Sequence, residues 1–292
     1  MSASLKGLLL GLLGVAIFAV SVPATKMATI SPGFDGLPPI FIAIGRAAAA
    51  GLLAILYLVA VRAPLPTPSQ AMRLVAAGLG IVIGFPLFSG LAVVHAQAIH
   101  VAVIVGALPL ATAVMSALFL RERASPAFWA MAFFGFLLVI AFAWISGEPG
   151  SVTGVGLADL LALLSVLSAS IGYVLGARMS REMRPEHVIS WILVLYLPFT
   201  TAVALFTFPA GPVAPVAWAG FAYVSIFSMW LGFFAWYRGL AADPMRVSQV
   251  QLLQPFLSML FAVPLLGERI TLTAIGFCLA IIATVALSRK LR

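Results

Sequence analysis

Apolar residues occur along this chain in ten long blocks, separated by short connections rich in proline, glycine and serine. As an α-helix, a block of about 20 residues crosses the roughly 30 Å hydrocarbon core of a bilayer. Blocks of this length without alternation exclude a transmembrane β-barrel, whose strands are shorter. The pattern predicts an all-α integral membrane protein with ten transmembrane helices, at residues 5–27, 38–61, 72–94, 99–119, 126–145, 154–177, 188–208, 215–237, 246–266 and 270–288.

One phrase occurs twice: residues 108–123 read LPLATAVMSALFLRER and residues 254–269 read QPFLSMLFAVPLLGER. Each copy opens on a proline, Pro109 or Pro255, and closes on a glutamate-arginine pair. The match extends backwards, because the first predicted helix ends in SVPATK and the sixth ends in YVLGAR. We expect two five-helix units, residues 1–147 and 148–292. Since five is odd, the second unit enters the membrane from the opposite side, which makes the two units inverted repeats.

The distribution of lysine and arginine predicts the orientation of the bundle, because cytoplasmic connections carry an excess of both. With both termini in the cytoplasm, the outer connections hold only Lys26 and Arg269, and Arg46 lies within the second helix. The cytoplasmic side then holds Lys6, Arg62, Arg73, Arg121, Arg123, Arg178, Arg181, Arg184, Arg238, Arg246, Arg289, Lys290 and Arg292. Tryptophans at helix ends are expected in the interfacial belts: Trp129, Trp144, Trp191, Trp218 and Trp236.

Composition excludes several other classes of protein. Hydrophobic residues make up 63% of the chain and charged residues 8%, against about 25% charged in a soluble domain. The net charge of +8 does not indicate nucleic-acid binding, because the basic residues stand singly or in small groups between apolar blocks. A single cysteine, Cys278, excludes a disulfide framework. No enzyme signature, dinucleotide loop or ATP-binding motif occurs, so we expect no cofactor and no enzymatic activity.

Ten helices, the five-plus-five repeat and the "P…GER" end of the fourth and ninth helices resemble the drug/metabolite transporter superfamily, and its EamA family in particular. Arg46 in the segment AIGRAAAA also fits that pattern. The resemblance covers essentially the whole chain, and within the family the chain looks most like the YddG-type exporters of aromatic and other amino acids. One departure is that the first copy reads RER where GER is more usual.

The ninth helix is the most informative polar helix. Gln251, Gln254 and Ser258 recur at i, i+3 and i+7 and therefore share one helical face. Amides in hydrocarbon need hydrogen-bonding partners, so this face points at protein or at a water-filled cavity. Contact between helices is one interpretation. A cavity lining is favoured, because this helix carries the repeated phrase.

Three other faces are candidates for the same cavity. On the eighth helix, Trp230, Phe234 and Tyr237 form an aromatic stripe, and such stripes serve packing more often than recognition. Phe85 and Ser89 share a face of the third helix, and Ser165, Ser168 and Gly172 form a small polar face on the sixth. Together these would line a cavity of aromatic and neutral polar character, which suits neutral or zwitterionic metabolites.

Arg46 lies about eight residues into its helix, some 12 Å deep at 1.5 Å per residue. Arginine at this depth is costly unless it is paired or faces water. It can anchor a substrate carboxylate, or it can extend towards the outer surface or pair with Asp159 or Asp35. Lys26 leaves similar alternatives open. Asp159 is expected to cap the start of the sixth helix, where the helix dipole favours an anion, rather than to relay protons.

The remaining polar and special residues carry weaker expectations. His95, His100 and His187 lack partners for a metal site and are expected to be solvated. Pro109 and Pro255 are expected to kink their helices, either as gating hinges or as fixed bends that shape the cavity. Two patterns of small residues, GLLLG at 7–11 and GIVIG at 80–84, predict close helix packing.

These observations lead to a secondary carrier of the inner membrane that exports amino acids or similar small metabolites by alternating access. Its partners are then a small molecule and the lipid bilayer. A first alternative is efflux of cationic or hydrophobic drugs by the same fold, which a membrane-embedded carboxylate in the cavity would favour. A membrane-embedded enzyme is a further alternative, and it would need clustered His, Asp or Glu within the spans, which are absent.

Overall fold

The computed structural model describes residues 3–29, 36–119, 125–146, 156–242 and 250–290. Within these ranges, eight helices are long and apolar enough to cross a membrane. Two shorter apolar helices, Gln251–Leu266 and Leu272–Leu287, follow where the ninth and tenth crossings are predicted. The prediction of an all-helical, multi-pass membrane protein is confirmed. Ten crossings and cytoplasmic termini stay predictions. Glu122 and the arginines on either side of it lie outside the described residues.

Helix boundaries follow the local sequence. Pro68, Pro185 and Pro215 each stand in the first turn of a helix. Proline lacks a backbone N–H, and in the first turn an N–H would have no acceptor within the helix. Thr67 and Gln70 form a capping box at one of these starts. The helices that result are α1 (Ala3–Thr29), α2 (Arg46–Ala60), α3 (Pro68–Gly78), α4 (Phe85–His95), α5 (Ala98–Val105), α6 (Leu108–Phe119), α7 (Pro126–Ser146), α8 (Leu157–Met179), α9 (Pro185–Phe206), α10 (Pro215–Tyr223), α11 (Gly232–Ala242), α13 (Gln254–Leu266) and α14 (Leu272–Lys290).

Three π-helical segments and one 3₁₀ turn interrupt these helices. The π segments are η1 (Phe41–Gly45), η2 (Leu79–Gly84) and η3 (Val224–Leu231), and the 3₁₀ turn is η4 (Gln251–Leu253). Segment η2 joins α3 to α4 and η3 joins α10 to α11, so the third and eighth predicted helices each contain a π segment near the middle. π-helical turns inside α-helices occur frequently at functional sites.

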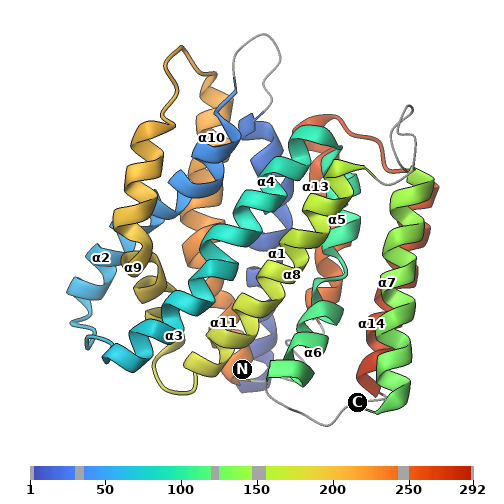
Figure 1. The fold of residues 1–292 in the computed structure, drawn as a ribbon, viewed down its shortest axis with the longest axis horizontal. Helices are drawn as coiled ribbons and strands as arrows, with labels where there is room; N and C mark the ends of the chain where they lie inside the picture. Colours follow the sequence, from blue (N-terminus) through green and yellow to red (C-terminus); the bar gives the residue numbers. More distant parts are fainter. Residues whose placement is uncertain (1–2, 30–35, 120–124, 147–155, 243–249, 291–292) are drawn as a thin grey trace.

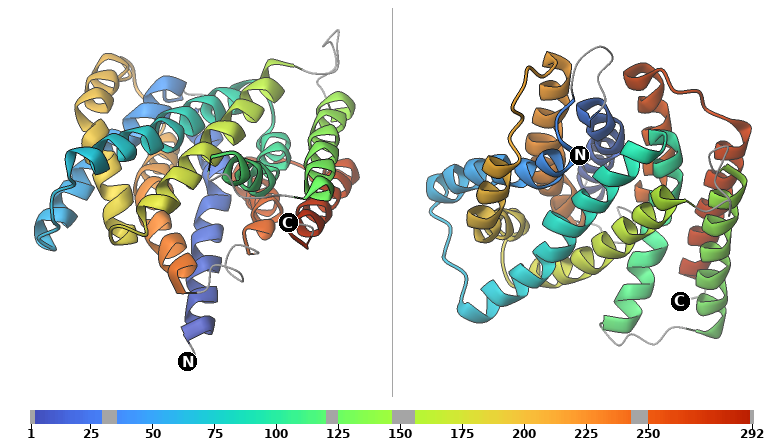
Figure 2. Two further views of the ribbon diagram at one scale, coloured as in Figure 1. Left: turned by 60° about the horizontal axis from the view of Figure 1, so that its bottom comes forward. Right: turned by 45° about the horizontal axis from the view of Figure 1, so that its top comes forward.

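The packing pairs helices that hold matching places in the two halves of the chain. At one side of the bundle α2 packs against α9, and at the other α7 packs against α14 (Figure 1). Both views of Figure 2 keep α7 and α14 side by side. In the centre, α1 packs against α10 and α11, whereas α8 packs against α3, η2 and α4. The first and sixth predicted helices therefore each pack against the third helix of the opposite half.

Small residues allow these central helices to approach closely. A Cβ on Gly239 of α11 would lie 2.8 Å from the Gly11 nitrogen on α1. A Cβ on Gly80 of η2 would lie 2.2 Å from the Ser168 carbonyl oxygen on α8, closer than real Cβ atoms approach. Close packing at both small-residue patterns is therefore confirmed. Trp236, expected in an interfacial belt, is only 5% exposed and packs against α1 at Gly14, so that expectation was wrong.

Candidate functional site

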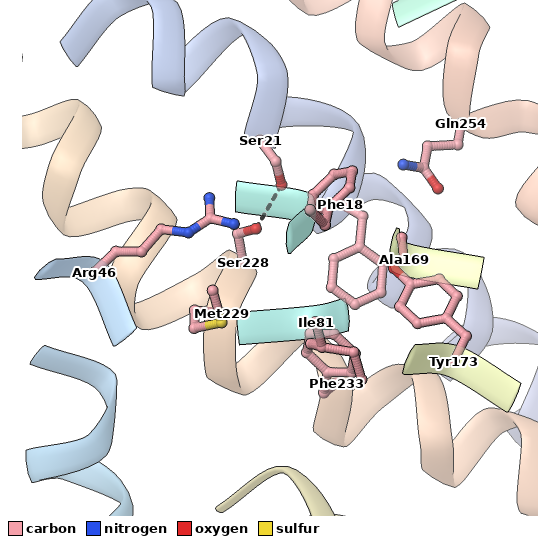
Figure 3. Close-up of a pocket in the computed structure, with 11 residues that line it drawn as sticks. Phe18, Ser21, Arg46, Ile81, Ala169, Tyr173, Ser228, Met229, Phe233 and Gln254 are labelled. Atoms are coloured by element: carbon pink, nitrogen blue, oxygen red, sulfur yellow. Dashed lines mark hydrogen bonds between the residues drawn. The ribbon is translucent and has the colours of Figure 1, made fainter. Parts of the chain in front are cut away.

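A cavity of about 20 Å³ lies in the middle of the bundle, where helices of both halves meet (Figure 3). This volume accommodates about one water molecule. Two of the three described π segments, η2 and η3, contribute to its wall, and so do α1, α2, α4, α8, α11 and the start of α13. The lining residues are Phe18, Ser21, Arg46, Ile81, Phe85, Ala169, Tyr173, Ser228, Met229, Phe233 and Gln254.

Arg46 is the cationic residue of this lining. It is 3% exposed, and its Nε atom has no hydrogen-bond partner among the described residues. Its guanidinium points towards Ser21 and Ser228, whose hydroxyl groups are hydrogen-bonded to each other at 2.6 Å (Figure 3). A buried charge without a counter-ion is costly. The arrangement therefore favours an anionic group that enters the cavity and completes the hydrogen bonds of Arg46.

A second cavity of about 10 Å³ adjoins the first and shares Gln254 with it. Ser258 lies in its wall, and the hydroxyl oxygen of Ser258 is buried without a hydrogen-bond partner in the described structure. The two halves touch here, because a Cβ on Gly106 would lie 3.1 Å from the Pro255 ring. The lining residues are Val22, Ala102, Val105, Gly106, Pro109, Gln251, Gln254, Pro255 and Ser258.

The two helices that carry the repeated phrase are broken beside this cavity. Helix α5 ends at Val105 and α6 begins at Leu108, so Pro109 stands in the first turn of α6. On the other half, η4 precedes α13, and Pro255 stands in the first turn of α13. Proline tends to kink a helix because it lacks the N–H donor. The regular α-helical pattern stops just before each proline, and the predicted kinks stay a prediction.

The EamA-like transporter family model matches residues 5–151 and matches again over residues 156–289. The chain belongs to the EamA-like transporter family. It is 40% identical over 293 residues to the uncharacterized transporter YdeK of Bacillus subtilis (strain 168), with 99% of each chain covered. A crystal structure at 18% identity covers 98% of each chain with a TM-score of 0.67, which is a likeness of fold. The chain is thus a multi-pass transporter of the bacterial inner membrane.

Seven of the residues predicted for the substrate site or for gating lie at the two cavities of this EamA-like transporter. Arg46, Phe85 and Gln254 line the larger cavity. Gln254 also lines the smaller one, together with Gln251, Ser258, Pro109 and Pro255. Their role in binding or gating stays a prediction, and the structure brings these seven together at the seam between the halves.

The other predicted residues line neither cavity. The Nε1 of Trp230 donates to Ser190, and its ring packs against Phe234 and Tyr57. Tyr237 packs against Phe233, and its buried hydroxyl has no hydrogen-bond partner in the described structure. Ser89 and Ser168 contact other parts of the helices instead of a cavity. The Ser89 hydroxyl donates to the Phe85 carbonyl, and Ser168 lies against Gly84.

The π segment explains why the aromatic stripe on the eighth helix does not face the cavity. The stripe assumed 3.6 residues per turn, whereas a π-helix hydrogen-bonds i to i+5 and so changes the direction in which later side chains point. With η3 spanning Val224–Leu231, Ser228 and Met229 line the cavity, and so does Phe233, four residues after Met229 in α11. Small polar residues inside an apolar block, such as Ser228, were the available signal.

A second signal lay in the matched helix ends SVPATK and YVLGAR. Ser21 and Tyr173 hold the first position in these two phrases, and both line the central cavity. Equivalent positions of the two halves thus meet at the same site, which the periodicity of either helix alone does not indicate.

Acidic residues with described positions lie towards the ends of the bundle. Asp159 accepts a hydrogen bond from the Gly156 nitrogen at 2.8 Å, so its predicted capping role is confirmed. Asp159 also pairs with His100 at 2.6 Å, and the His100 side chain is only 13% exposed, so the expectation of a solvated His100 was wrong. Asp159 therefore has partners other than Arg46, and Asp35 lies outside the described residues.

Proposed function

We propose that this protein is a secondary transporter that exports amino acids, aromatic and other neutral ones, or closely similar carboxylates, by alternating access. The observation that carries the proposal is Arg46, a buried cation with an unpartnered Nε in the wall of the central cavity. A carboxylate is the common metabolite group that matches the planar guanidinium with paired hydrogen bonds.

Charge in the rest of the lining supports a carboxylate over a cation. Among the residues described at the two cavities there is no aspartate or glutamate. A cationic drug would meet Arg46 without compensation, so efflux of cationic drugs is the less favoured function.

The lining also supports an apolar substrate side chain. Phe18, Phe85, Met229 and Phe233 contribute apolar surface to the lining. Ser21, Ser228 and Gln254 supply neutral donors and acceptors, which suit the ammonium and carboxylate groups of a zwitterion. Recognition by a few polar groups in an apolar pocket is the usual form of a small-molecule site.

The size of the cavity and the two matched halves support alternating access. A volume of about 20 Å³ does not hold an amino acid, so the halves must separate before a substrate binds. The two family matches, residues 5–151 and 156–289, support two units close to 1–147 and 148–292. Rocking of such units around a central site is the mechanism that inverted repeats make available.

The test is transport by purified protein in liposomes. Vesicles loaded with unlabelled phenylalanine or leucine are given the labelled amino acid, with and without a proton gradient, and counterflow is measured. The same assay uses phenylalaninamide, which keeps the ring and the ammonium but lacks the carboxylate. We expect flux of the amino acids and at least tenfold less flux of the amide. Flux of the amide or of a cationic dye without any amino-acid flux would overturn the proposal.

A further inference from the structure

The ion pair between Lys26 and Glu268 is one of those that join the two halves, and it lies near the end predicted to face outwards. Lys26 Nζ, close to the end of α1, lies 3.3 Å from an Oε atom of Glu268, which follows α13. Both side chains are largely covered, with exposed fractions of 16% and 8%. Glu268 also accepts hydrogen bonds from the backbone nitrogens of Ala98 at 2.7 Å and Ile99 at 2.8 Å. Lys26 donates to the Ala96 carbonyl at 2.6 Å.

These contacts connect three segments of the chain. The end of α1 and the start of α5 belong to the first half, and the α13–α14 connection belongs to the second. Glu268 uses both carboxylate oxygens, one for Lys26 and Ala98 and the other for Ile99. It thereby supplies the acceptors that the first N–H groups of α5 need, and its charge suits the helix dipole.

The ion pair lies between a wide hollow and the narrow cavities. On one side, a hollow of about 660 Å³ is lined by Lys26 and Glu268 with Gln97, Leu265 and Arg269 among others. On the other side, Val22 and Ala102 line the smaller central cavity. Val22 precedes Lys26 by four residues on α1, and Ala102 follows Ala98 by four residues on α5, a distance of about 6 Å along each helix.

We propose that Lys26, Glu268 and the start of α5 form the outer gate of the transporter, closed in this structure. The gate rests on the alternating access proposed above, but not on the choice of cargo. Substrate leaves the central cavity only when Glu268 separates from the α5 amides and from Lys26. Because the pair crosses the seam between the halves, a relative movement of the halves breaks all of these contacts together.

The first experiment measures access to the central cavity from outside. The natural cysteine, Cys278, is buried and is replaced by serine to give a background without cysteine. Val22→Cys then reports on the cavity directly beneath the gate, through its labelling rate with a membrane-impermeant maleimide applied to intact cells. We expect slow labelling with an intact gate and labelling at least tenfold faster with Glu268→Gln, because one amide oxygen cannot replace two carboxylate oxygens.

Two companion variants keep this experiment decisive. Lys26→Gln removes the ion pair but leaves Glu268 bonded to the α5 amides, so we expect a smaller, few-fold increase in the labelling rate. This variant replaces Glu268→Gln in the test if Glu268→Gln folds poorly. Arg269→Gln is the matched control, since Arg269 is exposed in the same hollow and is expected to leave the labelling rate unchanged. Equal labelling rates in all variants, or acceleration only from the cytoplasmic side, would overturn the gate.

The second experiment locks the gate. Lys26→Cys and Glu268→Cys are combined in the background without cysteine and joined by a short, reducible bifunctional thiol reagent. We expect flux in liposomes to fall at least tenfold after cross-linking and to return after reduction, whereas each single cysteine variant is unaffected by the reagent. Undiminished flux in the cross-linked protein contradicts the gate. Labelling of Val22→Cys needs no substrate, so an altered labelling rate without amino-acid flux would retain the gate and reject the cargo.

Discussion

The two halves of this transporter share a framework but differ in where they carry charge. Both halves have a helix broken before a proline, at Pro109 and at Pro255, and both have a π segment in the helix that packs on the opposite half. In contrast, α2 contributes Arg46 to the cavity, whereas α9, its packing partner from the second half, contains no lysine or arginine. In the proposed mechanism the shared features form the framework that moves, and the unshared Arg46 supplies the charge of the central cavity.

The last residues of the two matched helix ends, SVPATK and YVLGAR, also differ in their ion pairing. Lys26 and Arg178 hold the last position of SVPATK and YVLGAR. Lys26 is paired with Glu268 and largely covered, whereas Arg178 is exposed, with no ion pair in the described part of the chain. If the two halves are inverted repeats, Lys26 and Arg178 are equivalent residues at opposite membrane faces. In one state of the transporter we then expect one of them to form its ion pair while the other does not. The difference is what the proposed gate predicts when it is closed at the end of the bundle expected to face outwards.

The largest expected effect comes from the charge that only the first half carries. Arg46→Gln removes charge-assisted hydrogen bonds to the substrate, each of about 1.5 to 3 kcal/mol, so amino-acid flux should fall about 10- to 150-fold. Arg46→Lys keeps the charge without the planar group and should retain intermediate flux. Arg181 is exposed, so Arg181→Gln is the control and should transport normally. Normal flux in Arg46→Gln, with protein equally abundant, would mean that Arg46 serves structure alone.

A second comparison separates the cavity wall from the packing behind it. Gln254 lines both cavities, whereas Trp230 lines neither and bonds to Ser190. Gln254→Ala should therefore raise the KM for amino acids about tenfold, the value of one hydrogen bond, with an unchanged Tm. Trp230→Ala should lower the Tm of the detergent-solubilised protein, because it leaves a void and an unpartnered Ser190. A raised KM in Trp230→Ala, with a lowered Tm in Gln254→Ala, would instead place the substrate next to Trp230.

The repeated prolines test whether the shared framework moves. Pro109→Ala and Pro255→Ala each allow a continuous helix through the break beside the smaller cavity. If the breaks act as hinges, each variant should lower kcat a few-fold with little change in KM, and the two should behave alike. A change confined to KM would instead show that the breaks are fixed bends that shape the cavity. Flux measured over a range of substrate concentrations distinguishes these results.

The smallest expected effect concerns the two matched helix ends. Lys26→Gln should speed the outside labelling of Val22→Cys a few-fold, because it weakens the closed outer end. Arg178→Gln should leave that labelling unchanged or slow it, because Arg178 is exposed in this state. Equal acceleration by both variants would mean that the two helix ends are not engaged alternately.

The sequence by itself determined the class of protein, its helices and the pairing of its halves. Apolar blocks of about 20 residues and scarce charge leave only a helical membrane protein, since every backbone group must be hydrogen-bonded within lipid. The repeated phrase predicted which helices correspond, and the chain belongs to the family that this resemblance indicated. The break at each repeated proline and the cap by Asp159 were also predictable, because both depend on neighbouring residues in the chain.

The tertiary structure decided which faces meet. The π turns of η2 and η3 change the register of their helices, so a 3.6-residue count selected Trp230 where Ser228 and Met229 line the cavity. Lys26 and Glu268 are separated by most of the chain, and their contact depends on how the halves are packed. Local sequence determines helices because their hydrogen bonds are local, whereas a cavity and a gate arise from side chains brought together by packing across the whole chain.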